Sequence, residues 1–273
     1  MRDFSFRRVR FHFRALEEVR FGATAANMVR GALGLALHET APAAVYERLF
    51  KPRTATGPSG LADLPRPFVL RCPALDGLKV AAGGDFTIDI HLFDSTDMTA
   101  ETFQSAMAAW EQIGIGPRRA RVRLERAESE VCTLSLEADE SAAGRVTVQF
   151  VTPTELKAGG EVVERPEFAV LFARIRDRVA TLRATYGAGA LDVDFAELGE
   201  RAAAVRMERC EVTWERRERK AGVAGRSHSL GGFTGHAEYA GELGEFLPWL
   251  RAAQWTGVGR QTVWGKGEVR VIS

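Results

Sequence analysis

Alternating apolar and polar residues predict most of the strands in this chain. Residues 4–14 read FSFRRVRFHFR and divide into two faces: Val9, Phe11 and Phe13 on the apolar side, and Arg8, Arg10, His12 and Arg14 on the basic side. Strict alternation over this length is typical of a half-buried β-strand. Residues 85–94 repeat the pattern, and further strands are predicted within 67–73, 114–129, 145–153, 205–220, 229–241 and the last few residues.

Apolar residues spaced three and four positions apart predict helices between these strands. The clearest helix covers 25–39, AANMVRGALGLALHE, and Thr24 is in position to cap its first turn. Further helices are predicted over 99–113, 166–186 and 242–254, where Pro248 either kinks the last helix or lies near its start. Residues 51–66 are rich in Pro, Gly and Ser, which predicts a loop.

The order of these elements repeats once along the chain. Each half follows the order β-α-β-β-α-β, and the glycine-containing segments GIGPRRARVRL and GVGRQTVWGKGEVRV occupy the same place in the two halves. This order predicts an α+β fold of two tandem ferredoxin-like domains. We expect the first domain to cover 1–130 and the second 140–273, with the boundary near 130–145.

Composition limits the classes of protein that fit. The chain has 273 residues, 45% of them hydrophobic, and a net charge of +1, so a polyanionic partner has to be met by a local basic patch. The three cysteines lie far apart and form no CxxC pair, which favours buried thiols in a reducing compartment. No apolar run approaches about 18 residues, and no signal peptide is recognisable at the start. We therefore expect a cytoplasmic protein.

The glycine-rich segment near the end matches neither of the two common phosphate-binding motifs. A dinucleotide fingerprint needs a third glycine at Thr262, and a P-loop needs Ser or Thr at Gly267. Both motifs also open a helix, whereas this segment follows a helix and precedes a strand. Backbone N–H groups in such a loop can still meet anions. The alternative is a tight helix-to-strand connection, and glycine is common there as well.

Several stretches, in order along the chain, carry a likeness to a known family. They are MVRGALGLAL (28–37), YERLFKP (46–52), PRPFVLRCP (65–73) and the last forty residues up to GVGRQTVWGKGEVRV. The chain resembles the CRISPR-associated RAMP superfamily, and within it the endoribonuclease that processes precursor CRISPR RNA. The weakest part of the likeness is 130–225. Many relatives carry a small cysteine cluster where this chain has HETAPAAV (38–45), so we expect no structural metal there.

The resemblance implies cleavage of RNA without a metal or other cofactor. In such enzymes the 2′-OH of the RNA attacks the adjacent phosphate, leaving a 2′,3′-cyclic phosphate and a 5′-OH. The reaction needs a base, an acid and a cation for the charge on the phosphorane. The implied partner is CRISPR repeat RNA, as a stem-loop or a single strand. Other CRISPR-associated subunits or a second copy of the chain are further partners to consider; a membrane is not.

Three residues are the catalytic candidates. His38 ends the first predicted helix, close to where relatives place a catalytic histidine; the alternative is an ordinary cation at a helix C-terminus, which only adds stability. Tyr46 is suited to hydrogen-bond a phosphate or the 2′-OH, or it simply packs before Leu49 and Phe50. Lys51 is a candidate for stabilising charge, although most such lysines are only solvated.

The RNA-binding candidates lie on two predicted surfaces. The loop near the C-terminus and the strand before it supply Gly257, Gly259, Arg260, Gln261, Lys266, Gly267 and His236. The basic strand of the first half supplies Arg118, Arg119 and Arg121, followed by Arg123. A third basic stretch contains Arg217, Arg219, Lys220 and Arg226. Charge runs of this kind are usually solvated faces. We expect Trp255 and Trp264, on either side of the loop, to anchor it in the core rather than to stack on a base.

Two functions remain open on the sequence alone. The first is the endoribonuclease that processes CRISPR repeats. The second is a non-catalytic RAMP subunit that only binds CRISPR RNA within an interference complex. A generic ferredoxin-like RNA-binding module is more distant, because the aromatic residues of the RNA-recognition motif are missing.

Overall fold

The computed structural model describes residues 2–52, 64–140, 144–215, 218–220, 227–229 and 231–272. Side chains are described in all of these ranges except 218–220 and 227–229. The predicted loop at 51–66 lies largely outside the described residues, as do Arg217 and Arg226 of the third basic stretch.

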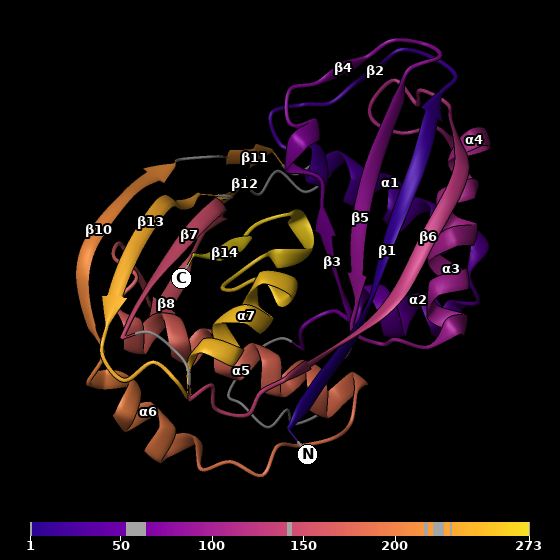
Figure 1. The fold of residues 1–273 in the computed structure, drawn as a ribbon. Coiled ribbons are helices and arrows are strands. Elements are labelled where there is room, and N and C mark those ends of the chain that lie inside the picture. Colours follow the sequence, from indigo (N-terminus) through magenta and orange to yellow (C-terminus); the bar gives the residue numbers. More distant parts are fainter. Residues whose placement is uncertain are drawn as a thin grey trace.

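The first half builds one four-stranded antiparallel sheet with helices packed on it. Its strands lie in the order β3-β5-β1-β6. The elements along the chain are β1 (Asp3–Ala15), α1 (Ala25–Thr40), α2 (Ala43–Phe50), β3 (Phe68–Arg71), β5 (Asp85–Leu92), α3 (Asp97–Ala108), α4 (Trp110–Ile113) and β6 (Val122–Ser135). The short pair β2 (Val19–Arg20) and β4 (Lys79–Val80) projects beyond one end of this sheet (Figure 1).

The second half repeats this topology. Its strands lie in the order β10-β13-β7-β14, which is the same sequence of second, third, first and fourth strand as in the first sheet. The elements are β7 (Arg145–Thr154), α5 (Phe168–Tyr186), α6 (Phe195–Ala203), β10 (Arg206–Glu215), β13 (Gly232–Ala240), α7 (Leu247–Thr256), the 3₁₀ turn η2 (Thr262–Trp264) and β14 (Val269–Ile272). The predicted fold of two tandem ferredoxin-like units is confirmed.

Two short hairpins and one 3₁₀ turn lie between these elements. They are β8 (Leu156–Ala158) with β9 (Glu161–Val163), β11 (Glu218–Lys220) with β12 (Ser227–Ser229), and η1 (Pro73–Leu75). Within the predicted strand over 205–220, the structure describes β10 up to Glu215 and β11 from Glu218, and residues 216–217 lie outside the described residues. The predicted helix over 99–113 is two helices, divided at Ala109.

Two helix starts differ from the prediction for clear physical reasons. Thr24 occupies the N-cap of α1, but its side chain makes no capping hydrogen bond; Asp76 accepts from the backbone N–H of Ala25 at 2.7 Å instead. A carboxylate there also suits the positive end of the helix dipole. Helix α7 begins at Leu247 rather than at 242, and Pro248 lies in its first turn, where a missing N–H costs nothing.

The two halves share apolar contacts. Alternate residues of β1 are buried as predicted, and Val9, Phe11 and Phe13 belong to the core under α1 and α3. The first residues of the same strand face the other core: Phe4 and Phe6 pack into the core of the second half. Strand β1 therefore ties the halves together, and the chain crosses between them beside α5 and α7 (Figure 1).

Candidate active site and nucleic-acid interface

The structure brings the three candidate catalytic residues together at the junction of α1 and α2. The ring of His38 meets the ring of Tyr46 edge to face, with centroids 5.3 Å apart and an interplanar angle of 86°. The Nζ atom of Lys51 lies 5.3 Å from the centre of the same Tyr46 ring. His38 and Lys51 are exposed, and Tyr46 is half-buried between them. The cluster is therefore open to a ligand on its outer side.

Local packing explains why α2 holds Tyr46 in this place. The Tyr46 ring stacks on Phe50 at 5.6 Å, and Phe50 is buried. Phe50 reaches the body of α1 because residue 34 is glycine: a Cβ there would lie 2.7 Å from the tip of the Phe50 ring. The close approach of α1 and α2 thus depends on Gly34. The ring contact between His38 and Tyr46 depends on the same approach.

Polar contacts fix α2 on its other side. Arg48 forms an ion pair with the buried carboxylate of Asp94 and donates to Thr99 Oγ1 at 3.2 Å. Burial alone would raise the pKa of Asp94, but hydrogen bonds from Arg48, Thr96 and Thr99 outweigh it and hold the pKa below its usual value. A charged Asp94 therefore anchors the helix that carries Tyr46.

Arg30 connects this cluster with the second half. Its guanidinium lies 4.6 Å from the centre of the Phe50 ring and 3.8 Å from that of Trp264. Both distances are within the range of cation–π contacts. Trp264 belongs to η2, in the glycine-rich loop, so the loop touches the support of the catalytic candidates through one arginine. Trp264 packs against the first core and Trp255 against the second, as expected.

The glycine-rich loop of the second half is mostly folded into the protein. The N–H groups of Gly257, Gly265 and Gly267 donate to the carbonyl oxygens of Ala253, Thr262 and Pro153. Gly257 and Gly267 are buried, while Gly259 and Gln261 are half-buried. These N–H groups already have protein partners, so the loop has the arrangement of a tight helix-to-strand connection.

The two basic residues of this loop face a buried carboxylate. Lys266 is 3% exposed, and its Nζ donates to Gly231 O at 2.6 Å and to Gln261 Oε1 at 3.0 Å. Arg260, which is exposed, pairs with the buried Glu155 at 2.6 Å. Burial lowers the pKa of Lys266 to about 8, although Glu155 acts in the opposite direction. Lys266 therefore points into the protein rather than to its surface.

The corresponding loop of the first half is open. Gly114 ends α4 and Gly116 follows it, both with positive φ, before the exposed residues Arg118 and Arg119. No ion pair of Arg118 or Arg119 occurs among the described residues. Arg121 differs, because its side chain and its backbone N–H both bond to Glu17. The predicted basic stripe is therefore divided into free and neutralised positions.

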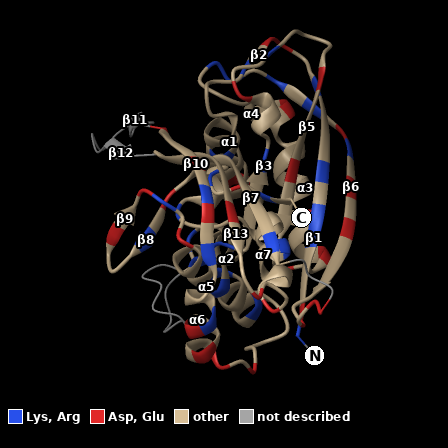
Figure 2. Cartoon of the chain, turned by 60° about the vertical axis from the view of Figure 1, so that its left-hand side comes forward, with Lys and Arg blue, Asp and Glu red and all other residues tan. Residues whose placement is uncertain are grey.

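Carboxylates neutralise the basic face of β1. Arg10 makes a two-pronged contact with Asp89 of β5, with both N–O distances at 2.7 Å. Further pairs join the same strand to its neighbours: Arg8 with Glu130, His12 with Glu128, and Arg14 with Asp85. Figure 2 shows blue β1 between red segments of β5 and β6. Sequence reasoning missed this pairing, which only the sheet register creates.

Two further histidines have protein partners. His236 pairs with Glu211 on the neighbouring strand β10 at 3.1 Å, and its side chain is 41% exposed. His91 is buried and bonds through Nδ1 to the carbonyl oxygen of Trp255 at 2.9 Å. Burial, together with the charge of Arg71, lowers the pKa of His91 to about 3, so its ring stays neutral. His91 therefore fastens the end of α7 to the first sheet.

In the described part of the chain no three His, Cys, Asp or Glu side chains gather as a metal site, and no helix is long and apolar enough to cross a membrane. Cys72 is buried as expected, but Cys132 and Cys210 are half-buried; all three are free thiols. Arg219 and Lys220 lie in β11, where only the backbone is described.

Comparisons with known proteins agree with this arrangement. A family model described as "CRISPR-associated endoribonuclease Cas6" matches residues 148–269, and one described as an "N-terminal domain" matches residues 4–143. No curated protein matches the chain.

Solved structures match along almost the whole chain. A Cas6 product complex has a TM-score of 0.64 at 18% identity, covering 98% of this chain and 100% of its own. Thermus thermophilus Cas6 has a TM-score of 0.60 at 16% identity, covering 98% of each chain. An RAMP protein binding different RNA substrates has a TM-score of 0.54 at 10% identity, covering 98% and 100%.

At these identities the structural matches show the fold, and the match to the Cas6 family model supplies the identity of the second half. The order of elements and the residues quoted above point in the same direction. Residues 148–269 thus match the CRISPR-associated endoribonuclease Cas6, and the fold shared along the whole chain supports a CRISPR-associated, RAMP-like endoribonuclease.

Proposed function

We propose that this protein cleaves CRISPR repeat RNA without a metal ion. The 2′-oxygen of one nucleotide forms a bond to the adjacent phosphorus, and the bond from phosphorus to the 5′-oxygen of the next nucleotide breaks. A base takes the proton of the 2′-OH, and an acid supplies a proton to the leaving 5′-oxygen. The products carry a 2′,3′-cyclic phosphate and a 5′-OH.

The observation that supports this chemistry is the contact of His38, Tyr46 and Lys51 around one ring. In the proposal His38 carries out one of the two proton transfers, because an imidazole ring can both donate and accept a proton. The Tyr46 hydroxyl holds the phosphate or the 2′-OH in line. Lys51 offsets the negative charge that grows on the phosphorane, and a compact ammonium group suits that role.

The RNA needs cations beyond the catalytic group. Arg118 and Arg119 are the candidates that we retain for phosphate contacts, because they are exposed and no ion pair holds either of them among the described residues. The glycine-rich loop of the second half acts indirectly in this proposal. It supports α1 and, through Trp264 and Arg30, the ring of Phe50.

The test is cleavage of a labelled CRISPR repeat RNA in the presence of EDTA. Wild-type protein should cut at one site and leave a cyclic phosphate. His38→Ala should lower the rate of the chemical step about 10²–10⁴-fold, the usual contribution of a general acid or base, while the Kd for RNA stays within about twofold. His12→Ala, which removes a paired histidine on the far face of the first sheet, is the matched control.

Two conservative changes separate chemistry from packing. Tyr46→Phe keeps the ring contacts with His38 and Phe50 and should still lower the rate, because only the hydroxyl is lost. Lys51→Arg should retain more activity than Lys51→Ala if the charge matters. Tight binding of the RNA with no cleavage by wild-type protein would instead identify a non-catalytic RAMP subunit. Cleavage by His38→Ala at the wild-type rate would refute the assignment of His38.

A further inference from the structure

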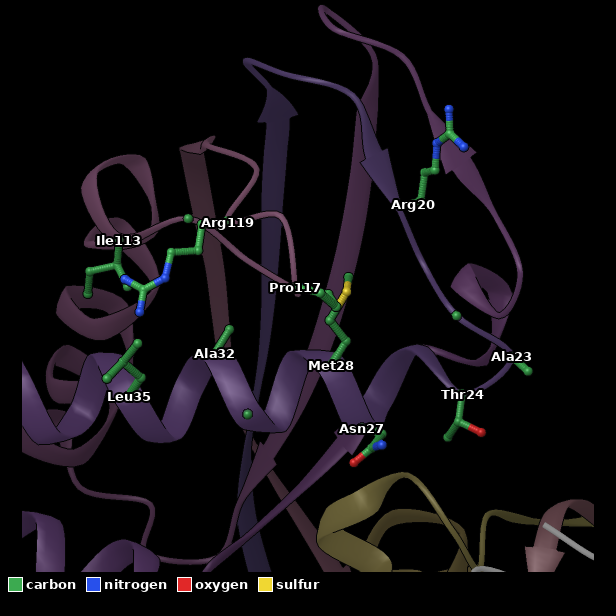
Figure 3. Close-up of a pocket in the computed structure, with 14 residues that line it drawn as sticks. Arg20, Ala23, Thr24, Asn27, Met28, Ala32, Leu35, Ile113, Pro117 and Arg119 are labelled. Carbon is green, nitrogen blue, oxygen red and sulfur yellow. The ribbon is translucent and has the colours of Figure 1, made fainter. Parts of the chain in front are cut away.

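An open cavity of about 760 Å³ lies along the outer face of α1. Its base is the helix from Met28 to Leu35, and its walls are the loop between α4 and β6 and the segment that leads from β2 into α1 (Figure 3). None of the residues that line it belongs to the catalytic cluster described above. The cavity nevertheless shares a helix with His38.

A glycine keeps this cavity open. Gly31 lies in the middle of α1, where glycine is less favourable than alanine. A Cβ added at Gly31 would meet nothing within 4 Å, so packing does not require glycine there. Gly34, one turn later, is different, because the Phe50 ring fills the place of its Cβ. Gly31 therefore weakens the helix locally and leaves an open floor in the cavity.

The chemistry of the walls suits a nucleobase. Met28, Leu35 and Ile113 provide apolar surface, and Leu35 is 37% exposed although it is a large apolar side chain. Figure 3 shows Leu35 and Ala32 on the helix, with Ile113 and Arg119 across from them. The planar guanidinium of an arginine stacks on bases. Apolar side chains also pack against bases in pockets that hold unpaired nucleotides.

The charge of the cavity also favours an anionic ligand, such as a nucleic acid, over a cationic one. Arg20 and Arg119 line the cavity, and no Asp or Glu is among its lining residues. Arg20 is partly neutralised by Glu18, whereas no ion pair of Arg119 occurs in the described part of the chain. Arg119 is thus the cation most available to a phosphate beside the cavity.

The geometry of α1 links the cavity to the proposed cleavage site. His38 follows Gly31 by seven residues, which is two turns and about 10 Å along a helix. At about 100° per residue the two positions also lie on almost the same face. A strand of RNA whose scissile phosphate lies at His38 passes over Leu35 and Gly31 if it follows the helix.

We propose that this cavity binds one unpaired base of the RNA strand that the protein cleaves, a short distance from the scissile phosphate. The inference rests on the proposed function and adds to it a site that selects single-stranded RNA next to the cut. The base lies against Met28, Leu35 and Ile113, and Arg119 contacts its ring or the adjoining phosphate. A base-paired nucleotide cannot enter, because its stacking in the duplex has to be broken first.

The first test fills the cavity. Gly31→Leu places a side chain in open space and should weaken binding about tenfold, as expected for the loss of one base contact. The probe is a CRISPR repeat RNA with a 2′-deoxy nucleotide at the cut site, and binding is followed by fluorescence anisotropy. Ser105→Leu, at an exposed position in the middle of α3, is the matched control and should leave the Kd unchanged.

A second variant separates binding from folding. Gly31→Ala should raise the Tm, because alanine favours the helix and no neighbour obstructs its Cβ, and should still weaken RNA binding about two- to threefold. A loss of affinity caused by misfolding would instead accompany a lower Tm. Unchanged affinity in both Gly31 variants, with wild-type protein binding and cutting the RNA, would overturn the cavity proposal and leave the proposed function standing.

The third test locates the base. The unpaired positions of the RNA are replaced one at a time by an abasic nucleotide. Wild-type protein should lose affinity at one position, and Gly31→Leu should be insensitive to that same change. An equal response at every position would overturn the proposal. Wild-type protein that binds no repeat RNA at low salt would overturn the proposed function together with this inference.

Discussion

The two glycine loops of this protein share a local structure and differ in their surroundings. Gly114 ends α4 with φ 73° and ψ 168°, and Gly257 ends α7 with φ 69° and ψ 173°. Gly116 and Gly259, two residues later, have φ of 71° and 79°. Each loop also contains one of the two non-glycine residues with positive φ in the described chain, Arg119 and Gln261.

The difference lies in what covers each loop. The second-half loop packs under the first turn of α1, where a Cβ at Gly265 would lie 2.4 Å from that of Ala26, and its lysine is buried beside Glu155. The first-half loop contacts α1 through the flexible Met28 side chain at Gly116, and it forms one wall of the open cavity. A glycine-rich loop with basic residues is therefore not in itself a phosphate site, because burial decides whether its N–H groups and charges are available.

The largest expected effect is on the free energy of unfolding, when one glycine in each loop is replaced by alanine. In Gly267→Ala the new Cβ would lie 2.0 Å from the carbonyl oxygen of Val258, and backbone cannot move away cheaply. We expect a loss of about 4 kcal/mol in the free energy of unfolding, measured in urea. Gly116→Ala meets only the Met28 side chain and should cost about 1–2 kcal/mol. Equal losses of unfolding free energy in the two variants would refute the proposed difference between the two loops.

The second prediction concerns acid stability where the halves meet. The folded state keeps His91 neutral down to about pH 3, while the unfolded chain takes up a proton near pH 6.5. The unfolded state thus binds more protons in between, and stability falls as the pH drops. From pH 7 to 4.5 this residue should account for about 2–3 kcal/mol of lost stability. His91→Asn should lose less stability than wild type over this pH range, measured by urea unfolding at both pH values.

A third, smaller effect on stability should appear at alkaline pH. Because the pKa of Lys266 is lowered from 10.5 to about 8, the unfolded chain still holds a proton that the folded protein has lost between these values. Stability should therefore rise by about 2 kcal/mol from pH 8 to 10. Lys266→Met should remove this rise, and Lys157→Met, at a less buried lysine of β8, should keep it. A lysine exposed to phosphate would show no such dependence.

The smallest effect concerns salt and RNA. Arg119→Ala should change stability by less than about 0.5 kcal/mol, as at most exposed positions. It should reduce the slope of log K against log salt concentration by about 0.7, the value for one contact to single-stranded phosphate. Arg260→Ala should leave this slope unchanged, because Arg260 already pairs with Glu155. A larger change in this slope for Arg260→Ala than for Arg119→Ala would indicate that the second-half loop, rather than the first-half loop, contacts the RNA.

Much of the architecture followed from local sequence patterns. The alternation in β1, the stripe of α1 and the repeated order of elements predict two ferredoxin-like units, because each pattern reports how an element faces its own core. The candidate catalytic residues could also be proposed from the sequence, because His38, Tyr46 and Lys51 lie within a stretch of fourteen residues. A single short turn is enough to bring them together.

Only the tertiary structure decided which polar residues are available. The pairing of Arg10 with Asp89, the burial of Lys266 beside Glu155 and the placement of Arg30 between Phe50 and Trp264 all join residues far apart in the chain. A periodic pattern records whether a side chain faces inward, but not which distant neighbour it meets. The sequence therefore determined the elements and their faces, and long-range packing determined where charge and open space remain for a ligand.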